Sequence, residues 1–459
     1  MQMDDFVSRE EYWKYLEELL EDRRYLKLRH EIIDDNVVDI SDFLEELSEE
    51  QAAVVFRMLP KDIGAEVFAH LEASSQQALA SAFSDKEVAD MLDKLFVDDA
   101  VDFLEEMPAN VVRRILSFTD SEKRDLINHY LQYPEDSAGS IMTAEFTDLK
   151  KKMTVREAID HLRKHGEDRE TIYTCYVTNR DRVLEGVVSV KALLLAQDDD
   201  LIENLMETDI IKAYTLDDQE AVAQLFHTYD YLAIPVVDNE NRLVGIVTVD
   251  DAVDILQEEV TEDFEKMAAM SPSERPYLKT SILHHARRRI PWLLFLMISA
   301  FINGSILEHY ESAFVALPTL IFFIPMLTDT GGNVGSQTAT MMIRGMTLGE
   351  IEFSDIVKVI WQETKVSFII GFVLAAINFI RIYYSYGAII ALTVSVALMV
   401  TVFMSAVVGG MLPLLASKLK LDPAIMAAPL ITTLVDAGAL FIYFGTAHLL
   451  LSSFGIPGV

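Results

Sequence analysis

A series of long apolar blocks in the C-terminal part limits most strongly what this chain can fold into. Five blocks span residues 290–306, 314–341, 367–384, 387–415 and 424–452. Each has roughly the 20 residues that an α-helix needs to cross the hydrocarbon core of a bilayer. Because backbone polar groups in lipid must be satisfied within the structure, the blocks predict a bundle of membrane-spanning helices.

The charged residues divide the chain at the same boundary. Residues 271–459 contain 10 acidic and 11 basic residues, whereas residues 1–270 contain 63 and 27, a net charge of −36. Nucleic acid is an unsuitable partner for so negative a surface, because its phosphates require clustered Lys and Arg. Multivalent cations are the natural counter-ions.

Charges beside the apolar blocks predict their orientation. Three arginines at 287–289 precede the first block, and the loop after it carries Glu308 and Glu311 without Lys or Arg. This places the start of the first span in the cytoplasm and, after five spans, the C-terminus outside. The N-terminus lacks the features of a secretory signal, and the single cysteine, Cys175, fits a reducing compartment. We therefore expect a multi-pass protein of the inner (plasma) membrane whose acidic part is cytoplasmic.

Residues 1–138 predict an all-α domain. Apolar residues recur at spacings of three and four, with Asp, Ser or Pro at the junctions. The segment Asp42–Leu47 recurs as Asp102–Met107, and the interval between the two copies is long enough for two helical-repeat units. We predict a small helical superhelix, either right-handed or armadillo-like.

A second duplication covers residues 139–258, where strands alternate with helices. The segments Gly186–Val190 and Gly245–Val249 share one pattern, and each comes after a strand and a polar turn and before a helix. The pattern resembles a tandem pair of α+β CBS domains, which we place at 139–204 and 205–258.

One CBS unit carries a nucleotide pattern. Gly245, Thr248 and Asp251 fit the Gly-x-x-Thr-x-x-Asp arrangement with which many CBS domains hold a ribose and phosphates, whereas Ala192 stands at the acidic position of the first unit. ATP is therefore a candidate ligand at these three residues.

Asp436 lies in the middle of the last apolar block. An ionisable group at that depth costs about 2.5 to 3.5 kcal/mol, so it should face a partner or a wet path rather than lipid. The other central segments offer no Lys or Arg as a partner. Asp436 is thus either a cation site on a conduction path or a protonated, hydrogen-bonded structural residue that joins helices.

The second block contains a polar, Gly-rich stretch, residues 328–340, with the sequence TDTGGNVGSQTAT. Such a stretch inside a span is tolerated where protein shields it or where it lines water. Its glycines also permit close helix packing, which is the alternative explanation. Together with Asp436 it favours a pore.

A strongly acidic helix is predicted after the second CBS unit, at residues 250–265, with no Lys or Arg before Lys266. Residues 251, 254, 258 and 262 fall on one face, where like charges repel by about 0.2 to 0.5 kcal/mol per pair. This column is either a solvated face or a cation-binding surface.

These features together resemble the MgtE-type magnesium transporters. The resemblance rests on the segments Gly-Gly-Asn-Val-Gly-Ser-Gln and Pro-Leu-Ile-Thr-Thr-Leu-Val-Asp, the CBS pair and the helical N-terminal domain, and it spans the chain. It implies a multidomain fold with a plug helix at 259–280 and a pore domain of five transmembrane helices at 281–459. It also implies a homodimer in which Asp436 binds hydrated Mg²⁺ at the dimer axis and Asn333, Gly335, Gln337 and Thr433 line the pore. Ser336 stands where the family often has Asn.

The resemblance further implies a gate. In the family, Mg²⁺ bridges the N-terminal domain, the CBS domains and the plug helix, which then occludes the pore. Mg²⁺ prefers hard oxygen ligands and keeps much of its water, so acidic surfaces that only approach each other can share it. Carried over, the regulatory positions are Asp98, Asp102, Gly139, Glu220, Asp230, Asp251, Asp254, Glu259, Glu262, Asp263 and Asp422.

Other functions use the same features. The alternatives are an exporter, a Co²⁺ or Ni²⁺ transporter, and a membrane-anchored CBS nucleotide sensor without ion flux. An enzyme is disfavoured, because the sequence has no Walker A motif, no paired intramembrane acids and no His-Glu-x-x-His segment, and Asp436 stands alone.

Overall fold

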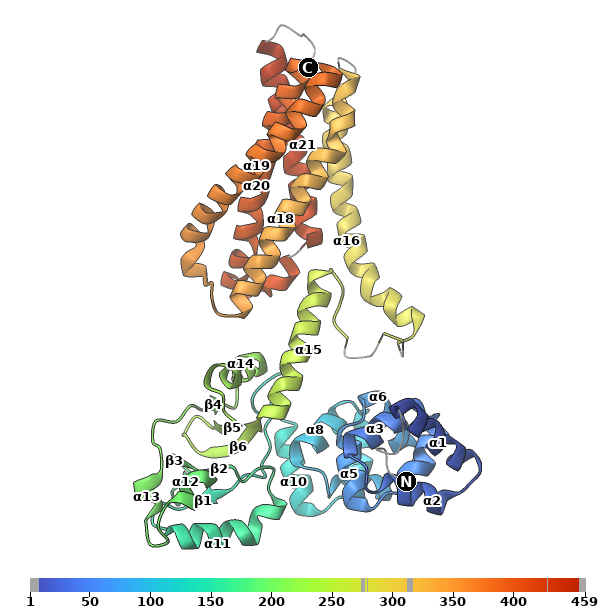
Figure 1. Cartoon of the computed structure of the whole chain (residues 1–459), viewed down its shortest axis with the longest axis vertical. Coiled ribbons are helices and arrows are strands. Elements are labelled where there is room, and N and C mark those ends of the chain that lie inside the picture. Colours follow the sequence, from blue (N-terminus) through green and yellow to red (C-terminus); the bar gives the residue numbers. More distant parts are fainter. Residues whose placement is uncertain (1–7, 274–276, 279, 312–316, 427, 454–459) are drawn as a thin grey trace. The chain divides into compact units, whose positions relative to one another are not determined.

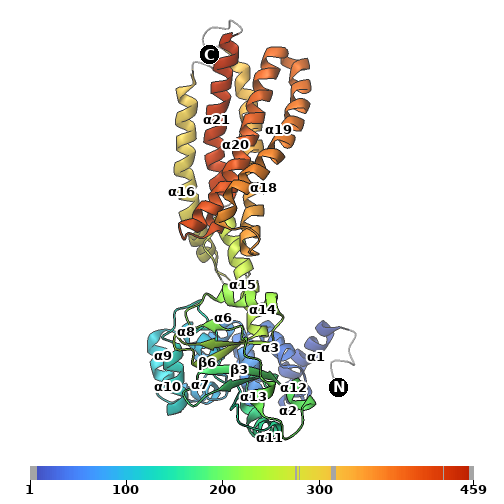
Figure 2. The same cartoon turned by 90° about the vertical axis from the view of Figure 1, so that its left-hand side faces the viewer.

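The computed structural model describes residues 8–273, 277–278, 280–311, 317–426 and 428–453. The chain forms two compact units, Met1–Gln257 and Glu258–Val459. The first unit combines helices with two small sheets, and the second is helical (Figures 1 and 2). Each unit is described separately below.

The described part of the first unit begins with ten short helices. Their bounds are α1 Arg9–Glu21, α2 Tyr25–Ile32, α3 Val37–Glu46, α4 Glu49–Phe56, α5 Lys61–Ala69, α6 Ala73–Ala82, α7 Asp85–Leu92, α8 Val97–Glu105, α9 Ala109–Leu116 and α10 Ser121–Tyr130. From α3 onward the helices begin at positions 37, 49, 61, 73, 85, 97, 109 and 121, so the interval between starts is constant. Side chains at the N-caps define several starts, as where Ser48 and Ser84 each form a capping box.

The helices pack as a superhelix in which helices two apart in the sequence contact each other, for example α3 on α5, α5 on α7 and α8 on α10. Buried aromatic residues join successive layers, as where the rings of Phe68 and Phe103 meet edge-on at 5.0 Å. The predicted helical domain is confirmed, but its repeat differs from our expectation. The similarity between positions 42–47 and 102–107 links α3 to α8, five helices apart, which is not a whole number of helix pairs.

The CBS pair follows, with two three-stranded sheets of the same topology. The first contains β1 Asp148–Leu149, β2 Thr174–Thr178 and β3 Leu184–Ser189, and the second contains β4 Ala213–Tyr214, β5 Ala233–Val237 and β6 Leu243–Thr248. In each sheet the outer, shortest strand pairs parallel with the central strand, which pairs antiparallel with the third. The helices are α11 Val155–His165, α12 Val190–Leu195, α13 Ile202–Leu205 and α14 Gln219–Tyr229, with a 3₁₀ turn at Gly166–Asp168.

The repeated glycines have equivalent structural roles. A Cβ on Gly186 would lie 2.7 Å from the sulfur of Met206, and one on Gly245 would lie 2.7 Å from the sulfur of Met142. Each strand therefore needs a residue without a side chain where a methionine crosses it. The duplication in the sequence is a duplication of structure.

Helix α15, Val249–Met267, continues from β6 across the boundary between the units. It confirms the acidic helix predicted at 250–265. The connector predicted as a helix over 259–280 is helical only to Met267, and among the described residues that follow, the next helix begins at Ile282.

The described part of the second unit contains five long helices and three short 3₁₀ segments. The long helices are α16 Ile282–His309, α18 Ile324–Thr347, α19 Ile356–Tyr386, α20 Ala388–Lys418 and α21 Ala428–Ser453, and the 3₁₀ segments are η3 Pro318–Phe323, η4 Phe353–Asp355 and η5 Pro423–Met426. Within the described residues, four segments are long and apolar enough to cross a membrane: 282–309, 353–386, 388–418 and 423–450. The remaining predicted block, 314–341, corresponds to η3 and α18, and part of it lies outside the described residues.

Packing in this unit centres on α20. Helices α18, α19 and α21 all contact it, and α18 and α21 also contact each other (Figure 1). The buried residues of α20 are mostly small or β-branched, including Ala397, Thr401 and Ser405, which lets helices approach closely.

Candidate functional site

One face of α18 carries a line of polar side chains. Asp329, Asn333 and Gln337 are spaced by one helical turn, so they lie one above another, and all three are exposed in the chain. The glycines at 331 and 335 are buried on the other side of the helix, and Gly332 is buried against Thr432 of α21. We call this exposed line, Asp329, Asn333 and Gln337, the polar stripe.

Glycines bring α18 close to its neighbours. A Cβ on Gly331 would lie 2.8 Å from Val435, and one on Gly335 would lie 2.7 Å from Ile431, both on α21. A Cβ on Gly409 of α20 would lie 2.3 Å from the carbonyl oxygen of Gly335. Gly335, which we predicted to line the pore, is thus a packing residue on the face opposite the polar stripe.

The same contacts give the register of α18 and α21. Because residue 331 meets 435 and residue 335 meets 431, the helices run antiparallel, and Asp329 lies at nearly the same depth as Asp436. The two carboxylates are close enough to repel each other, and Asp436 is partly buried. Our inference from the sequence that Asp436 stands alone is therefore wrong. The sequence signal for Asp329 was its place at the start of the polar stretch.

Thr433 lies one turn before Asp436 on the same helix. It is partly buried, and its hydroxyl donates to the carbonyl oxygen of Pro429 at 2.9 Å. A threonine bonded in this way remains able to accept a hydrogen bond from water.

In the first unit, carboxyl groups of the helical domain meet those of the CBS pair. Asp98 is 8% exposed, and burial followed by the charges of Asp99, Asp251 and Glu170 raises its pKa well above the ordinary value. We call these four residues the interdomain acidic cluster. Two of them, Asp98 and Asp251, were predicted; Asp99 and Glu170 were missed because no motif links them to the CBS residues that they meet.

The other members of this cluster are perturbed in the same direction. Burial raises the pKa of Asp99 to about 6, and the charge of Asp251 adds to it. Burial and the charges of Asp251 and Asp99 raise the pKa of Glu170 to about 8. Burial raises the pKa of Asp251 to about 6, although the hydroxyl of Thr248 donates a hydrogen bond to its carboxylate. The fully ionised cluster is therefore unfavourable without a cation.

Several predicted regulatory residues lie outside this cluster. Asp102 is exposed on α8, one turn beyond Asp98; Glu220 is in the first turn of α14; and Asp230 ends that helix in the left-handed conformation. The amide of Gly139 donates to the carbonyl oxygen of Thr215 at 3.0 Å. On α15, Asp254 is exposed and Glu259 is partly buried.

A second group of charges lies in the second unit. Lys266 on α15 contacts Glu262 at 2.7 Å and Asp422 at 2.6 Å, and burial together with the nearby charge of Asp422 raises the pKa of Asp263. We call Glu262, Asp263, Lys266 and Asp422 the α15 cluster. Its three acids were predicted, whereas the lysine among them was missed.

Neither cluster is a closed metal cage. In the described part of the chain, no three His, Cys, Asp or Glu side chains converge closely enough to hold a metal ion. The carboxylates are hard ligands of the kind that Mg²⁺ binds, and an ion that keeps its water does not need direct convergence.

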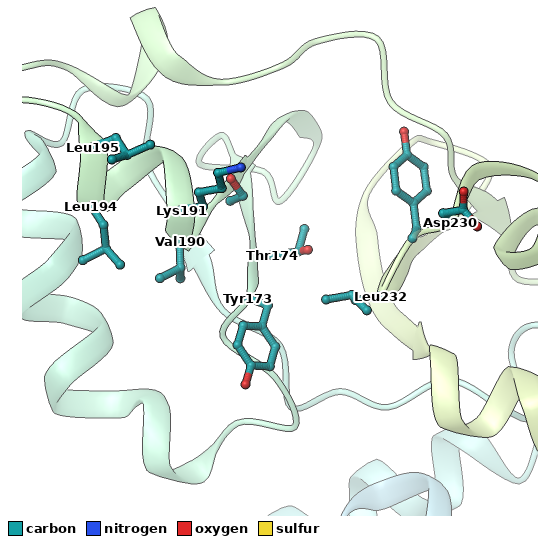
Figure 3. Close-up of a pocket in the computed structure, with 10 residues that line it drawn as sticks. Tyr173, Thr174, Val190, Lys191, Leu194, Leu195, Asp230 and Leu232 are labelled. Atoms are coloured by element: carbon teal, nitrogen blue, oxygen red, sulfur yellow. The ribbon is translucent and has the colours of Figure 1, made fainter.

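A pocket of about 640 Å³ lies between the two CBS units (Figure 3). Its walls include Tyr173, Ser189 and Lys191 from the first unit and Asp230 and Tyr231 from the second. The predicted nucleotide residues Gly245, Thr248 and Asp251 do not line it. Thr248 is buried, and the pocket contains its counterpart in the first unit, Ser189.

Comparison with known proteins gives matches along the chain. Family models match the MgtE intracellular N domain at residues 35–136, the CBS domain at 138–199 and 202–258, and MgtE, a divalent cation transporter, at 324–446. The magnesium transporter MgtE of Thermus thermophilus is 34% identical over 95% of this chain and 98% of its own length. That of Bacillus subtilis is 34% identical over 95% of this chain and 96% of its own length.

Two solved structures resemble the N-terminal part. One is the soluble part of a magnesium transporter, with a TM-score of 0.52 and 32% identity over 55% of this chain and 99% of that chain. The other is the cytosolic domain of the Mg²⁺ channel MgtE in complex with ATP, with a TM-score of 0.50 and 34% identity over 52% of this chain and 98% of that chain.

Proposed function

Because the chain belongs to the MgtE family of divalent cation transporters, we propose that it is a Mg²⁺-selective uptake channel that cytosolic Mg²⁺ closes. The chain is a multi-pass membrane transporter and not an enzyme. We place it as a homodimer in the inner membrane, with the helical and CBS parts in the cytoplasm and the C-terminus outside. The proposed pore domain begins at residue 281 and has five spans per chain.

The observation that carries the proposal is the pair of carboxylates at one depth, Asp329 and Asp436, beside the polar stripe. Charged groups inside a membrane face water, an ion or a partner rather than lipid. The other side of α18 is packed against α20 and α21, so the stripe is the side left for an ion path. In a homodimer this path would bring together the carboxylates of two chains, with Asn333, Gln337 and Thr433 supplying neutral oxygens.

The driving force for uptake is the membrane potential. A divalent ion gains about 4.6 kcal/mol per 100 mV on entering a negative cytoplasm, twice the value for a single charge. A passive channel therefore suffices, and no nucleotide hydrolysis is needed for transport.

Regulation follows from the two groups of carboxylates. When cytosolic Mg²⁺ is plentiful, hydrated ions would neutralise the interdomain acidic cluster and the α15 cluster and hold the plug part of α15 in the closed position. When Mg²⁺ falls, the carboxylates repel and the hold on the plug part of α15 weakens. Further oxygen ligands would come from Asp102, Gly139, Glu220, Asp230, Asp254 and Glu259.

Flux through reconstituted protein tests the proposal. Proteoliposomes that contain a Mg²⁺-sensitive dye should show Mg²⁺ influx with the wild-type chain and none with Asp436→Ala. Glu350→Gln, which removes an exposed acid outside the helices, should conduct normally. Influx through Asp436→Ala at the wild-type rate would refute the pore assignment.

Competition in the same assay separates the rival functions. If Co²⁺ or Ni²⁺ blocks Mg²⁺ influx when its concentration is below that of Mg²⁺, the result would favour a transporter of those ions. Flux only out of vesicles would favour an exporter. Nucleotide binding without any flux would favour a membrane-anchored sensor.

ATP binding is a second proposed property. The pocket between the CBS units joins exposed aromatic side chains, Tyr173 and Tyr231, to Lys191 and the hydroxyl of Ser189. Aromatic faces suit an adenine ring, and a lysine with a hydroxyl suits phosphates. A relative's cytosolic domain binds ATP, which supports ATP as the ligand of this pocket.

A further inference from the structure

The last turn of α15 packs against the end of the long apolar helices that we place on the cytoplasmic side. We call the part of the second unit from α16 to α21 the membrane unit. Met267 lies against Ile343 of α18 and Ala424 of η5 in a small apolar cluster. Beside it, the ammonium of Lys266 lies between the carboxylates of Glu262 on its own helix and Asp422 at the start of η5. A protein cation therefore bridges two of the three acids in the α15 cluster.

The ammonium of Lys266 is held from two sides. It forms ion pairs with one carboxylate from its own helix and one from the segment before η5. The side chain of Lys266 is 21% exposed, less than those of Glu262 at 36% and Asp422 at 28%. An ammonium offers three donors and a compact charge, so one lysine can hold two carboxylates together.

We propose that Lys266 is a built-in counter-ion that docks the end of α15 on the membrane unit without Mg²⁺ and raises the Mg²⁺ concentration at which the α15 cluster binds the ion. The second part rests on the proposed regulation by Mg²⁺. Its cause is electrostatic: the ammonium neutralises one of three carboxylate charges and occupies oxygens that a hydrated ion would otherwise contact.

A second ion pair supports docking without metal at this end of α15. The carboxylate of Glu265, next to Lys266, forms an ion pair with Arg288 near the start of α16. It also accepts a hydrogen bond from the backbone N–H of Ser273 at 2.8 Å. The guanidinium of Arg288 also donates to the carbonyl oxygen of Ser271 at 2.6 Å. Two neighbouring residues thus join α15 to separate elements of the membrane unit through protein contacts alone.

Accessibility of residue 267 measures this docking directly. The chain is full-length and purified in detergent, carries Met267→Cys, and reacts with a water-soluble maleimide in EDTA and across a Mg²⁺ titration. The natural cysteine, Cys175, is buried and adds little background. We expect the parent to be partly protected in EDTA and further protected by Mg²⁺, and Lys266→Gln to react at least threefold faster than the parent in EDTA.

The titration tests the second part of the proposal. The Mg²⁺ midpoint for protection of Lys266→Gln should lie about three- to tenfold below the midpoint for the parent, because a competing positive charge has been removed. Lys266→Arg should behave as the parent. Lys420→Gln is the matched control, since it removes an exposed lysine close to Asp422 in the sequence.

The outcomes are separable. Equal reaction rates of Lys266→Gln and the parent in EDTA would overturn the docking role, and an unchanged or higher Mg²⁺ midpoint would overturn the competition. Should Lys266→Gln not fold, Asp422→Asn tests the same bridge and should also lose protection in EDTA. The assay does not involve flux, so a failure of the proposed channel function and a failure of the Lys266 proposal give different results.

Discussion

Replacement of Glu170 by glutamine gives the sharpest test of the interdomain acidic cluster. The pKa of this carboxyl rises from an ordinary 4.5 to about 8, first through burial and then through the charges of Asp251 and Asp99. A rise of that size corresponds to about 4 to 5 kcal/mol between the two protonation states, at about 1.36 kcal/mol per pKa unit. Because the side chain is partly exposed, solvent screening reduces this to about 2 kcal/mol.

The sign of the effect follows from the raised pKa. Between pH 4.5 and about 8 the folded state keeps its proton while the unfolded state releases it, so the free energy of unfolding falls as the pH rises through this window. Below pH 4.5 both states are protonated and the penalty vanishes. Glu170→Gln should therefore stabilise residues 1–257 by about 2 kcal/mol at pH 8.5 and have almost no effect at pH 4.5.

Thermal unfolding of residues 1–257 in EDTA, at both pH values, measures this difference. A gain of about 2 kcal/mol corresponds to about 4 to 8 °C in a unit of this size. Glu167→Gln is the control, because Glu167 is an exposed acid in the preceding turn. An equal effect of both substitutions at pH 8.5, or destabilisation by Glu170→Gln there, would show that the carboxylates do not repel as described.

Three further outcomes are expected. Gly409→Ala should lower the thermal midpoint of the full-length protein in detergent, because the new Cβ would lie 2.3 Å from a backbone oxygen of α18 and overpacking costs about 1 to 3 kcal/mol. The control, Gly304→Ala, should leave the midpoint unchanged, because nothing lies within 4 Å of its Cβ. Equal midpoints for the two variants would contradict the close packing. Tyr173→Ala should weaken ATP binding about tenfold in a fluorescence titration, on the scale of about 1 to 3 kcal/mol per stacked base, whereas Tyr214→Ala should not; unchanged affinity would move ATP away from the pocket. Asp329→Asn should slow Mg²⁺ influx severalfold while leaving it measurable, and wild-type influx would remove Asp329 from the ion path.

Local patterns in the sequence were sufficient to predict most of the fold. Each CBS unit repeats a strand, a turn and a glycine at one spacing, so the duplication is readable along the chain. The apolar blocks and the acidic helix 250–265 follow from composition over a single segment. In each case the determining residues are neighbours in sequence.

The constant period of the N-terminal helices was harder to see. The buried positions recur at the fourth, fifth, seventh and eighth residues of α3, α4, α5 and α7, but different residues occupy them. Only the similarity between positions 42–47 and 102–107 therefore stood out in the sequence. The glycines of α18 show a related difficulty. Whether Gly335 lines a path or packs against a helix depends on which side faces α20, and only tertiary structure decides that.

The partners that sequence reasoning missed are all brought in by folding. Glu170 reaches Asp98 and Asp251 from the first CBS unit, and Asp329 reaches the depth of Asp436 through the antiparallel register of α18 and α21. Lys266 ends an acidic run that the sequence shows directly. Its bridge to Asp422, however, joins segments that are separated in the sequence by four long helices, α16, α18, α19 and α20. No spacing rule predicts these juxtapositions.

The central claim is that Asp436 faces a hydrated ion path with Asp329 beside it. The most direct measurement is an experimental density map of the full-length protein in a lipid bilayer with Mg²⁺. The account predicts density for a hydrated ion level with these two carboxylates, continuous with water along Asn333 and Gln337. A map in which Asp436 is packed dry between helices, with lipid against the polar stripe, would contradict it.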